Sequence, residues 1–428
     1  MKSIENLRKL SFLVYGLGIT GKSVVNFFKR NEIKNYLVWD DENKNLYKKK
    51  RTHNLNKTLK EVDYIILSPG ISLENSKNKT KLFDYKNKII TDLDLIFSLK
   101  NFLKSVVVTG SNGKSTTCKI ISHVLKKNNF KILLGGNIGT PILNLKIKKN
   151  SYIIIEASSF QLAHSKFIRP DYAILLNITN DHLDWHGTMK NYVNSKFKIF
   201  NFQTSDQFSL VNKNFKNFFK KRKLHGKLVI PNVKTYKKFK SKIKNTYIKS
   251  KINDENMSFV FTLSKILGMS EKSFFKSLNS FKGLPHRYEL FLKKKNCLFI
   301  NDSKATSFQS TKLALKNTEN IFWIVGGLPK KNDKIILNDL KKNVLKCYII
   351  GNHFNFFKQQ LKNQISCLVT KNLKNSIIQI LKDIKSQENK YNTILLSPAS
   401  ASYDQFLNFE NRGNEFKRLC NFYASKYI

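Results

Sequence analysis

A glycine-rich loop in the first half of the chain has the most chemically specific spacing: TGSNGKST, residues 109–116. The loop follows an apolar run and precedes a helical pattern, so its backbone amides and the helix N-terminus could hold phosphate groups. Lys114 would neutralise the β- and γ-phosphate oxygens, and the Ser115 hydroxyl could bind Mg²⁺. The loop is shorter than the general GxxxxGK(S/T) pattern, but none of these roles needs the missing residues. It predicts a site for a nucleoside triphosphate.

A second glycine loop lies near the amino end, where Gly16, Gly18 and Gly21 follow a strand pattern and precede a helical one. Such a turn favours a diphosphate. Asp40 stands about 20 residues beyond Gly21, where an acidic residue can accept hydrogen bonds from a ribose or a base. Alone, the pattern indicates a dinucleotide domain with NAD as its ligand, or a tight turn without one. Two phosphate-binding loops in one chain argue instead for two nucleotides: one that supplies energy, and another that is the part of a substrate by which the protein binds it.

Three further residues could take part in chemistry near the phosphate-binding loop of residues 109–116. Glu156 ends an apolar run, and a carboxylate at the end of a strand beside a phosphate loop can bind Mg²⁺. The same residue could also be a solvated turn residue. His182, in the polar cluster NITNDHLDWH (residues 177–186), could bind a metal or cap a turn. Lys196, in the helix that follows, could be one more surface lysine.

Short β-branched runs alternate with longer helical stretches, which predicts an α/β fold with mostly parallel sheets. A new strand-loop-helix unit begins at Ser105, and a loop at residues 283–285 separates a helix from a later strand. We expect three domains: residues 1–90, Rossmann-like; residues 91–282, of the P-loop ATPase type; and residues 283–428, a Rossmann-like α/β domain.

The chain has 428 residues and a formal net charge of +48. This charge would suit a nucleic-acid partner. However, lysine spread over every segment, with abundant Asn, Ile and Phe, is typical of an AT-rich genome, so we expect a solvated basic surface and no nucleic-acid partner. No apolar run approaches the roughly 20 residues of a membrane span, and the amino end lacks a signal-peptide pattern. Five scattered cysteines without a CxxC pair fit reduced thiols. We therefore expect a cytoplasmic protein without membrane insertion.

Taken in order, these blocks resemble the Mur ligases, ATP-dependent amide-forming enzymes of peptidoglycan precursor assembly. The resemblance covers essentially the whole chain, and its last blocks are similar to those of the family member that adds D-glutamate. It rests on GSNGKST (residues 110–116), EASSFQ (156–161), NITNDHLDWHG (177–187), Lys196, LPHRYE (284–289), NDSKAT (301–306), Gly326-Gly327 and SPASASYDQF…FENRG (397–413).

The resemblance implies an ATP site formed by Gly110, Ser111, Asn112, Gly113, Lys114, Ser115, Thr116, Asn253, Asn256, Arg287 and Asp302. It also implies two Mg²⁺ ions, bound by Ser115, Glu156, His182 and Lys196. Lys196 would act as a carbamate, which turns a cation into an anionic oxygen ligand. Lys114, His182 and Lys196 would be the catalytic residues.

For the other substrates, the resemblance implies a uridine diphosphate end in the first domain rather than NAD, and D-glutamate in the third domain. The UDP substrate would contact Gly18, Ile19, Thr20, Asp40, Ser68, Pro69, Gly70, Asn137, Ser158 and His182. The D-glutamate pocket would contain Lys304, Thr306, Lys330, Ser402 and Phe409, where two cations can receive two carboxylates.

The expected reaction joins D-glutamate to UDP-N-acetylmuramoyl-L-alanine through an acyl phosphate, on a monomer. Four alternatives remain open. A sister ligase would add another amino acid, although the NDSKAT block and the absence of a DNPR-like motif argue against it. A folate polyglutamylating enzyme would share the nucleotide domain but lack the loop of Gly16, Gly18 and Gly21. A nucleic-acid-dependent ATPase would use the basic surface, and an NAD-dependent oxidoreductase would leave Lys114 and Glu156 unexplained.

Overall fold

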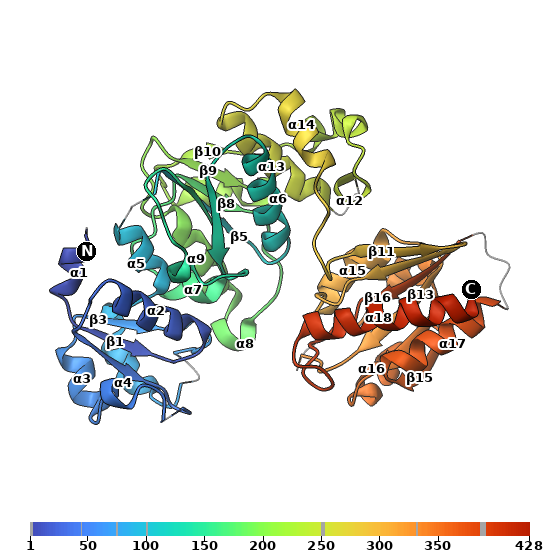
Figure 1. Cartoon of the computed structure of the whole chain (residues 1–428), viewed down its shortest axis with the longest axis horizontal. Helices are drawn as coiled ribbons and strands as arrows, with labels where there is room; N and C mark the ends of the chain where they lie inside the picture. The colour runs from blue at the N-terminus through green and yellow to red at the C-terminus, as the bar shows by residue number, and fades with distance from the viewer. Residues whose placement is uncertain are drawn as a thin grey trace. The chain divides into compact units, whose positions relative to one another are not determined.

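The computed structural model describes residues 3–43, 45–73, 76–99, 102–249, 253–330, 333–385 and 391–428. These residues form three β-sheets with helices packed on them (Figure 1). The chain divides into two compact units, residues 1–243 with 255–281 and residues 244–254 with 282–428. The predicted α/β class with three sheet-containing regions is confirmed, whereas the domain boundaries near residues 90 and 282 remain predictions.

The first sheet is parallel, with the spatial order β2 (Tyr36–Trp39), β1 (Phe12–Tyr15), β3 (Tyr64–Leu67) and β4 (Ile89–Ile90). Its helices are α1 (Ile4–Arg8), α2 (Ile19–Arg30), α3 (Leu55–Glu61) and α4 (Lys79–Asp84). Every residue of β1 is buried, as is typical of a parallel strand. Helix α2 packs on this sheet through Phe28, whose ring lies 4.9 Å from that of Phe12.

The second sheet is also parallel, with the order β10 (Lys227–Val229), β9 (Phe208–Val211), β8 (Tyr172–Leu175), β5 (Lys104–Thr109), β7 (Tyr152–Glu156) and β6 (Ile132–Gly136). The helices along this part of the chain are α5 (Asp92–Leu99), α6 (Lys114–Lys127), α7 (Ser159–His164), α8 (Leu183–His186), α9 (Met189–Phe197), α10 (Lys216–Lys221), α11 (Val233–Lys238), α12 (Thr246–Lys249), α13 (Asp254–Ile266) and α14 (Glu271–Asn279). Strand β5, which leads into the phosphate loop, lies inside the sheet between β8 and β7.

The third sheet belongs to the second unit and has the order β11 (Glu289–Lys294), β12 (Cys297–Asn301), β16 (Asn392–Leu396), β13 (Ile321–Gly326), β14 (Val344–Ile350) and β15 (Cys367–Lys371). Only β11 runs antiparallel to its neighbour. The helices are α15 (Phe308–Lys316), α16 (Phe354–Leu361), α17 (Leu373–Lys385) and α18 (Phe409–Tyr427). Across the described residues, no helix combines the length and the apolar character that crossing a membrane requires.

One continuous hydrophobic core joins the first two sheets. Phe12 of β1 and Val107 of β5 belong to the same cluster of buried side chains. Helix α5, which connects the two sheets along the chain, contributes Leu93, Leu95 and Ile96 to that cluster. Because they share a core, the two sheets form one unit, and the loops at their edges are held in a fixed relation.

Close packing requires a glycine at position 21, in the amino-terminal glycine loop. Gly16 has a left-handed backbone, with φ of 90°. Helix α2 starts so close to this turn that a Cβ on Gly21 would lie 1.9 Å from the carbonyl oxygen of Gly16. Only glycine allows the helix to begin at this distance from the turn.

We predict that Gly21→Ala lowers the free energy of unfolding of the first unit by about 1–3 kcal/mol, because the added methyl group forces the helix away from the turn. Gly70→Ala is the matched control at the same sheet edge, since a Cβ there would meet no atom within 4 Å. The control should change the free energy by less than about 0.5 kcal/mol. Urea unfolding followed by tryptophan fluorescence measures both, and equal stabilities would contradict the packing argument.

Candidate active site

The loops that carry most predicted site residues follow neighbouring parallel strands. In the first sheet they follow β1, β2 and β3; in the second, β5, β7 and β8; in the third, β12, β16 and β13. The carboxyl ends of parallel strands share one edge of a sheet, and ligands of open α/β sheets bind at that edge. Each sheet therefore gathers three of the predicted loops at its binding edge.

The phosphate loop leaves β5 at Gly110 and enters α6 at Lys114. Gly113 caps the helix in the left-handed conformation, with φ of 83°. A Cβ on Gly113 would lie 2.4 Å from Oδ1 of Asn256, so glycine lets α13 approach the loop. The fold thus brings Asn256, predicted for the ATP site from a distant stretch of sequence, against the loop. Asn253 is buried just before α13.

Residues after β8 hold the phosphate loop in shape. Asn177 accepts from the Ser111 amide through its carbonyl oxygen and from the Asn112 amide through Oδ1, both at 2.9 Å. The Ser111 hydroxyl accepts from the Thr179 amide at 2.9 Å and lies 2.8 Å from the Tyr192 hydroxyl. The loop is therefore preorganised by the segment that follows β8 and by Tyr192 of α9.

Two lysines meet at this loop. Lys114 Nζ donates to the carbonyl oxygens of Gly110 and Ser111, each at 2.8 Å. Lys196 Nζ, from α9, donates to the same Gly110 oxygen at 2.8 Å. Lys196 is 1% exposed, and burial lowers the pKa of its ammonium well below the usual value. Repulsion from Lys114 lowers the pKa further, against the opposite effect of Asp181. Burial next to Lys114 therefore favours the neutral amine of Lys196.

Glu156, at the end of β7, has a carboxylate that fits a metal ligand. It is 2% exposed; Oε1 accepts from Asn137 Nδ2 at 2.9 Å, whereas Oε2 is buried without a hydrogen-bond partner. A buried carboxylate oxygen is costly unless a cation meets it. Ser115 is buried in the first turn of α6. No cluster of three or more His, Cys, Asp or Glu side chains at metal-binding spacing occurs in the described part of the chain. The donors that Ser115 and Glu156 offer are oxygens, the ligand type that Mg²⁺ prefers.

His182 stands at the amino end of α8 with a left-handed backbone, φ 54°. Its Nε2 lies 3.4 Å from Oδ2 of Asp181, and its ring meets that of Phe160 edge-on, with centroids 4.7 Å apart. His182 is the capping residue of α8, although its side chain makes no cap hydrogen bond. The imidazole therefore contacts both aromatic rings and a carboxylate.

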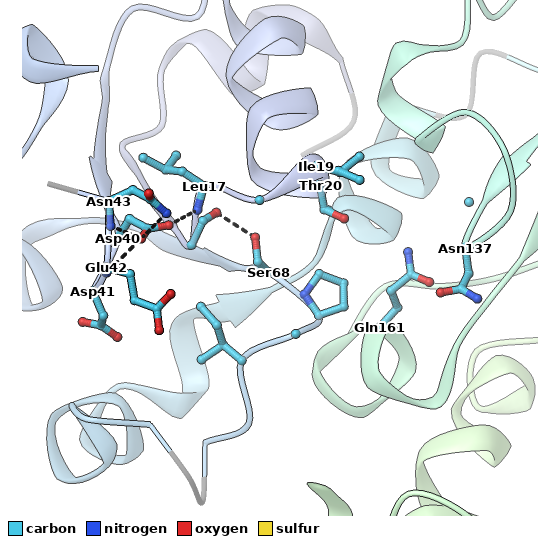
Figure 2. A pocket seen from close by; sticks show the side chains of 16 residues that line it. Leu17, Ile19, Thr20, Asp40, Asp41, Glu42, Asn43, Ser68, Asn137 and Gln161 are labelled. Carbon is cyan, nitrogen blue, oxygen red and sulfur yellow. Dashed lines mark hydrogen bonds between the residues drawn. The ribbon is translucent and has the colours of Figure 1, made fainter. Parts of the chain in front are cut away.

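The amino-terminal glycine loop (residues 16–21) and residues of the second sheet's loops and helices line a cavity of about 540 Å³ (Figure 2). Among the described residues that line it, none is lysine or arginine, despite the net charge of +48. A diphosphate there would depend on backbone amides and the start of α2. Ser158 and His182, both predicted for this site, do not line the cavity. The predicted residues that do are Gly18, Ile19, Thr20, Asp40, Ser68, Pro69, Gly70 and Asn137.

Asp40 holds together two of the loops that line this cavity. Its Oδ2 accepts from the Leu17 amide at 2.6 Å, and its Oδ1 accepts from the amides of Glu42 and Asn43 at 3.0 and 2.7 Å. Burial raises the pKa of Asp40, but these hydrogen bonds outweigh it and hold the pKa below its usual value. The ionised carboxylate therefore ties the glycine turn to the loop after β2, where the sequence predicted only a ligand contact.

Ser158 reaches the cavity wall through Gln161. The Ser158 hydroxyl accepts from the Gln161 amide, and Gln161 Oε1 accepts from the Ser158 amide, each at 3.2 Å. This reciprocal capping box starts α7. Gln161 lines the cavity and lies, with Asn137, on the opposite side from Asp40 in the view of Figure 2.

In the second unit, Asp302 follows β12. Its Oδ2 accepts from the Ser397 hydroxyl at 2.8 Å and its Oδ1 from the Tyr288 amide at 3.0 Å. Burial raises the pKa of Asp302 to about 7, against the lowering effect of these bonds and of Arg287. Asp302 and Arg287, both predicted for the nucleotide, thus lie close enough to influence each other.

The residues predicted for D-glutamate lie in loops at one edge of the third sheet and at the start of α18. Lys304 Nζ lies 4.6 Å from the centre of the Phe409 ring. Leu328 and Ala401 exchange backbone hydrogen bonds of 2.9 and 3.1 Å, which join the loops leading to Lys330 and to Ser402. Thr306 precedes α15 on the loop of Lys304.

Arg412, on α18, links two of these loops. It is 1% exposed, and its guanidinium donates to the carbonyl oxygens of Ser303 and Ser400 at 2.8 and 3.0 Å. Burial lowers the pKa of Arg412 to about 10, and the negative charge of Asp404 counteracts only part of this effect. The arginine therefore fixes the Lys304 loop relative to the Ser402 loop.

Sequence reasoning missed several residues that shape these sites. Gln161 stood in the EASSFQ block without a role, and Asp41 and Asn43 adjoin Asp40 and line the same cavity. Asn177 stands just after β8, so its position at a strand end was an available signal. Tyr192 gave no signal, because it meets Ser111 only through the tertiary fold.

Matches to known proteins follow the order of these structural parts. Residues 10–82 match the family described as Mur ligase MurD-like, N-terminal domain, and residues 108–277 match the Mur ligase middle domain. The UDP-N-acetylmuramoylalanine--D-glutamate ligase of Rickettsia felis is 34% identical, with 95% of this chain and 96% of that protein covered. The protein of the same name from Buchnera aphidicola subsp. Schizaphis graminum is also 34% identical, with 95% and 97% covered.

Solved structures share the fold. The MurF ligase of Thermotoga maritima in complex with ADP has a TM-score of 0.57 at 16% identity, covering 99% of this chain and 100% of that one. UDP-N-acetylmuramate-alanine ligase MurC of the same organism has a TM-score of 0.55 at 16% identity, covering 97% and 100%. Together with the identity to relatives along nearly the full length, these findings show that the chain belongs to the Mur ligase family.

Proposed function

We propose that this chain joins D-glutamate to UDP-N-acetylmuramoyl-L-alanine, using ATP and releasing ADP and phosphate. The observation that carries the proposal is the meeting of Lys114 and Lys196 at the phosphate loop, with Glu156 at the end of the neighbouring strand β7, in a chain of this family. Relatives that bear the name of this D-glutamate ligase align over nearly the whole chain. The other family members in the comparison share only the fold at 16% identity, so they give a sister activity less support.

A free carboxylate is a poor acyl donor, so the reaction begins by activating it. An oxygen of the alanyl carboxylate attacks the γ-phosphorus of ATP, the bond from phosphorus to the β–γ bridging oxygen breaks, and ADP leaves. Lys114 offsets the charge on the phosphate oxygens in this step. The amine of D-glutamate then attacks the carbonyl carbon of the acyl phosphate, inorganic phosphate leaves, and the nitrogen loses a proton.

Two Mg²⁺ ions would screen the repulsion between the attacking carboxylate and the triphosphate. We assign Ser115 and Glu156 to one ion and His182 to the second. Support comes from the partnerless oxygen of Glu156 at the end of β7 and from the buried Ser115 at the start of α6.

Lys196 is proposed to act as a carbamate, formed when its amine adds to CO₂ and loses a proton. Only a neutral amine can react in this way, and burial beside Lys114 favours the neutral form. Carbamate formation would turn this neutral amine into an anionic oxygen ligand for the metal.

The remaining substrates are assigned to the first and third sheets. The cavity beside Gly18, Thr20 and Asp40 would take the uridine diphosphate end, and Asn137 the sugar-peptide end. Lys304, Thr306, Lys330, Ser402 and Phe409 would take D-glutamate. A reaction driven by ATP belongs in the cytoplasm, and we expect the protein to act there as a monomer, without a nucleic-acid partner.

We predict that phosphate release from ATP requires both UDP-N-acetylmuramoyl-L-alanine and D-glutamate. The measurement offers each amino acid in turn, with L-glutamate and diaminopimelate as controls. Release with a different amino acid would indicate a sister ligase. Release without the UDP-sugar, raised by RNA at low salt, would indicate a nucleic-acid-dependent ATPase.

Lys196→Arg should lower kcat by at least about 100-fold, because arginine cannot form the carbamate. Lys198→Arg is the matched control, since Lys198 lies two residues away and donates instead to the carbonyl oxygens of Ala163 and Ser165. With ¹³C-labelled bicarbonate, a carbamate resonance should appear in the parent and in the control and be absent from Lys196→Arg. A parent without that resonance would remove the carbamate from the account.

Lys304→Ala should raise the KM for D-glutamate by about 10- to 100-fold and leave the KM for ATP unchanged, because the ammonium that receives an amino-acid carboxylate would be lost. Lys312→Ala is the control: Lys312 Nζ also lies over a phenylalanine ring, 5.4 Å from that of Phe308, but on α15. Equal effects of both variants on the KM for D-glutamate would contradict the assignment of the pocket.

A further inference from the structure

A buried carboxylate on α5 contacts the cavity wall through a single side chain. Asp92, the first residue of α5, is 2% exposed. Both of its oxygens lie 3.3 Å from Nε2 of Gln161, which lines the cavity. Asp92 itself does not line the cavity, so it can act on a ligand there only by controlling Gln161.

The contact decides which end of the Gln161 amide faces which neighbour. A carboxylate accepts hydrogen bonds but does not donate them, so the NH₂ group must point toward Asp92. Oε1 then points toward Ser158, where it accepts from the backbone amide at 3.2 Å and from the hydroxyl at 3.1 Å. With the amide reversed, its NH₂ group would face the backbone N–H of Ser158, and two donors would meet.

Asn137, which lies on the same side of the cavity as Gln161, has an amide that is also oriented by a carboxylate. Nδ2 of Asn137 donates to Oε1 of Glu156 at 2.9 Å. Asn137, which follows β6, and Gln161, on α7, both line the cavity, and each amide is held by a buried carboxylate. The cavity wall on this side therefore has a fixed pattern of donors and acceptors.

We infer that Asp92 is a positioning residue for the UDP-sugar substrate: by holding the Gln161 amide in one orientation, it fixes Ser158 and the wall that receives the sugar-peptide part. The inference rests on the proposed function for the identity of the substrate. The contact also explains a buried charge for which the proposed reaction has no use. Burial raises the pKa of Asp92 to about 6, and the bond from Gln161 counteracts this effect.

Asp94, two residues further along α5, supplies a matched control. It is equally buried, but its oxygens accept from the backbone amides of Thr91, Lys166 and Phe167 at 2.7–2.8 Å. Asp94 thus ties α5 to the chain after α7 without touching a residue of the cavity wall. Its loss should affect stability and not the donor pattern of the cavity.

The test is a double-mutant cycle of Asp92→Asn, Gln161→Glu and the two combined, with Asp94→Asn beside them. Asp92→Asn replaces one acceptor by a donor, so it should raise the KM and the calorimetric Kd for UDP-N-acetylmuramoyl-L-alanine by about tenfold. The Kd of UDP alone and the KM of ATP should stay unchanged, because neither ligand reaches this wall. Gln161→Glu places two carboxylates together and should weaken substrate binding further.

The combined variant decides the matter. Its asparagine would donate to the new glutamate, which would still accept from the Ser158 amide, so KM and Kd should return to within about threefold of the parent. A combined variant as impaired as Asp92→Asn, or a similar rise in Kd in Asp94→Asn, would overturn the inference. If Asp92→Asn fails to fold, the combined variant still tests the contact: a folded protein with parental Kd supports it, and one that also fails to fold contradicts it. A parent that binds UDP-N-acetylmuramoyl-L-alanine without ligating D-glutamate would refute the proposed function but not the role of Asp92.

Discussion

The edge at which parallel strands end determines where chemistry can occur in this protein. A parallel strand has to be followed by a crossover before the next one begins, so every loop at the carboxyl edge is free to carry ligand contacts while the helices cover the faces. In the central sheet, β5 lies between β7 and β8. That order alone brings the phosphate loop, Glu156 and Asn177 together.

A second constraint is the cost of buried charge. Lys114 and Lys196 share one carbonyl oxygen of Gly110, and Glu156 keeps one carboxylate oxygen without a partner. Such an arrangement is unfavourable for folding and favourable for binding a charged ligand. Elsewhere in the same unit, buried carboxylates are fully used to orient amides, as Asp40 and Asp92 are. Glu156 differs in that only one of its two carboxylate oxygens holds an amide, that of Asn137.

The sequence predicted best what is local. The phosphate loop, the amino-terminal glycine loop and Glu156 could be identified because strand, turn and helix follow one another within a few residues. The spacing of Asp40 indicated its place in the cavity, but not that its carboxylate holds three backbone amides, because those bonds depend on the turn closing over it. Tyr192 and Asp92 act across the fold, and no local pattern distinguishes them from ordinary core residues. The continuous core of the first two sheets could likewise not be predicted from the sequence, since it arises from packing between elements far apart along the chain.

The central claim is that the phosphate loop activates a carboxylic acid for capture by an amine. Its most direct test uses UDP-N-acetylmuramoyl-L-alanine with both oxygens of the alanyl carboxylate replaced by ¹⁸O, followed by mass spectrometry of the products. The account predicts one ¹⁸O in each phosphate released and the other in the new amide. Phosphate that carries no ¹⁸O would show that water, and not the carboxylate, attacks ATP, and would contradict the account.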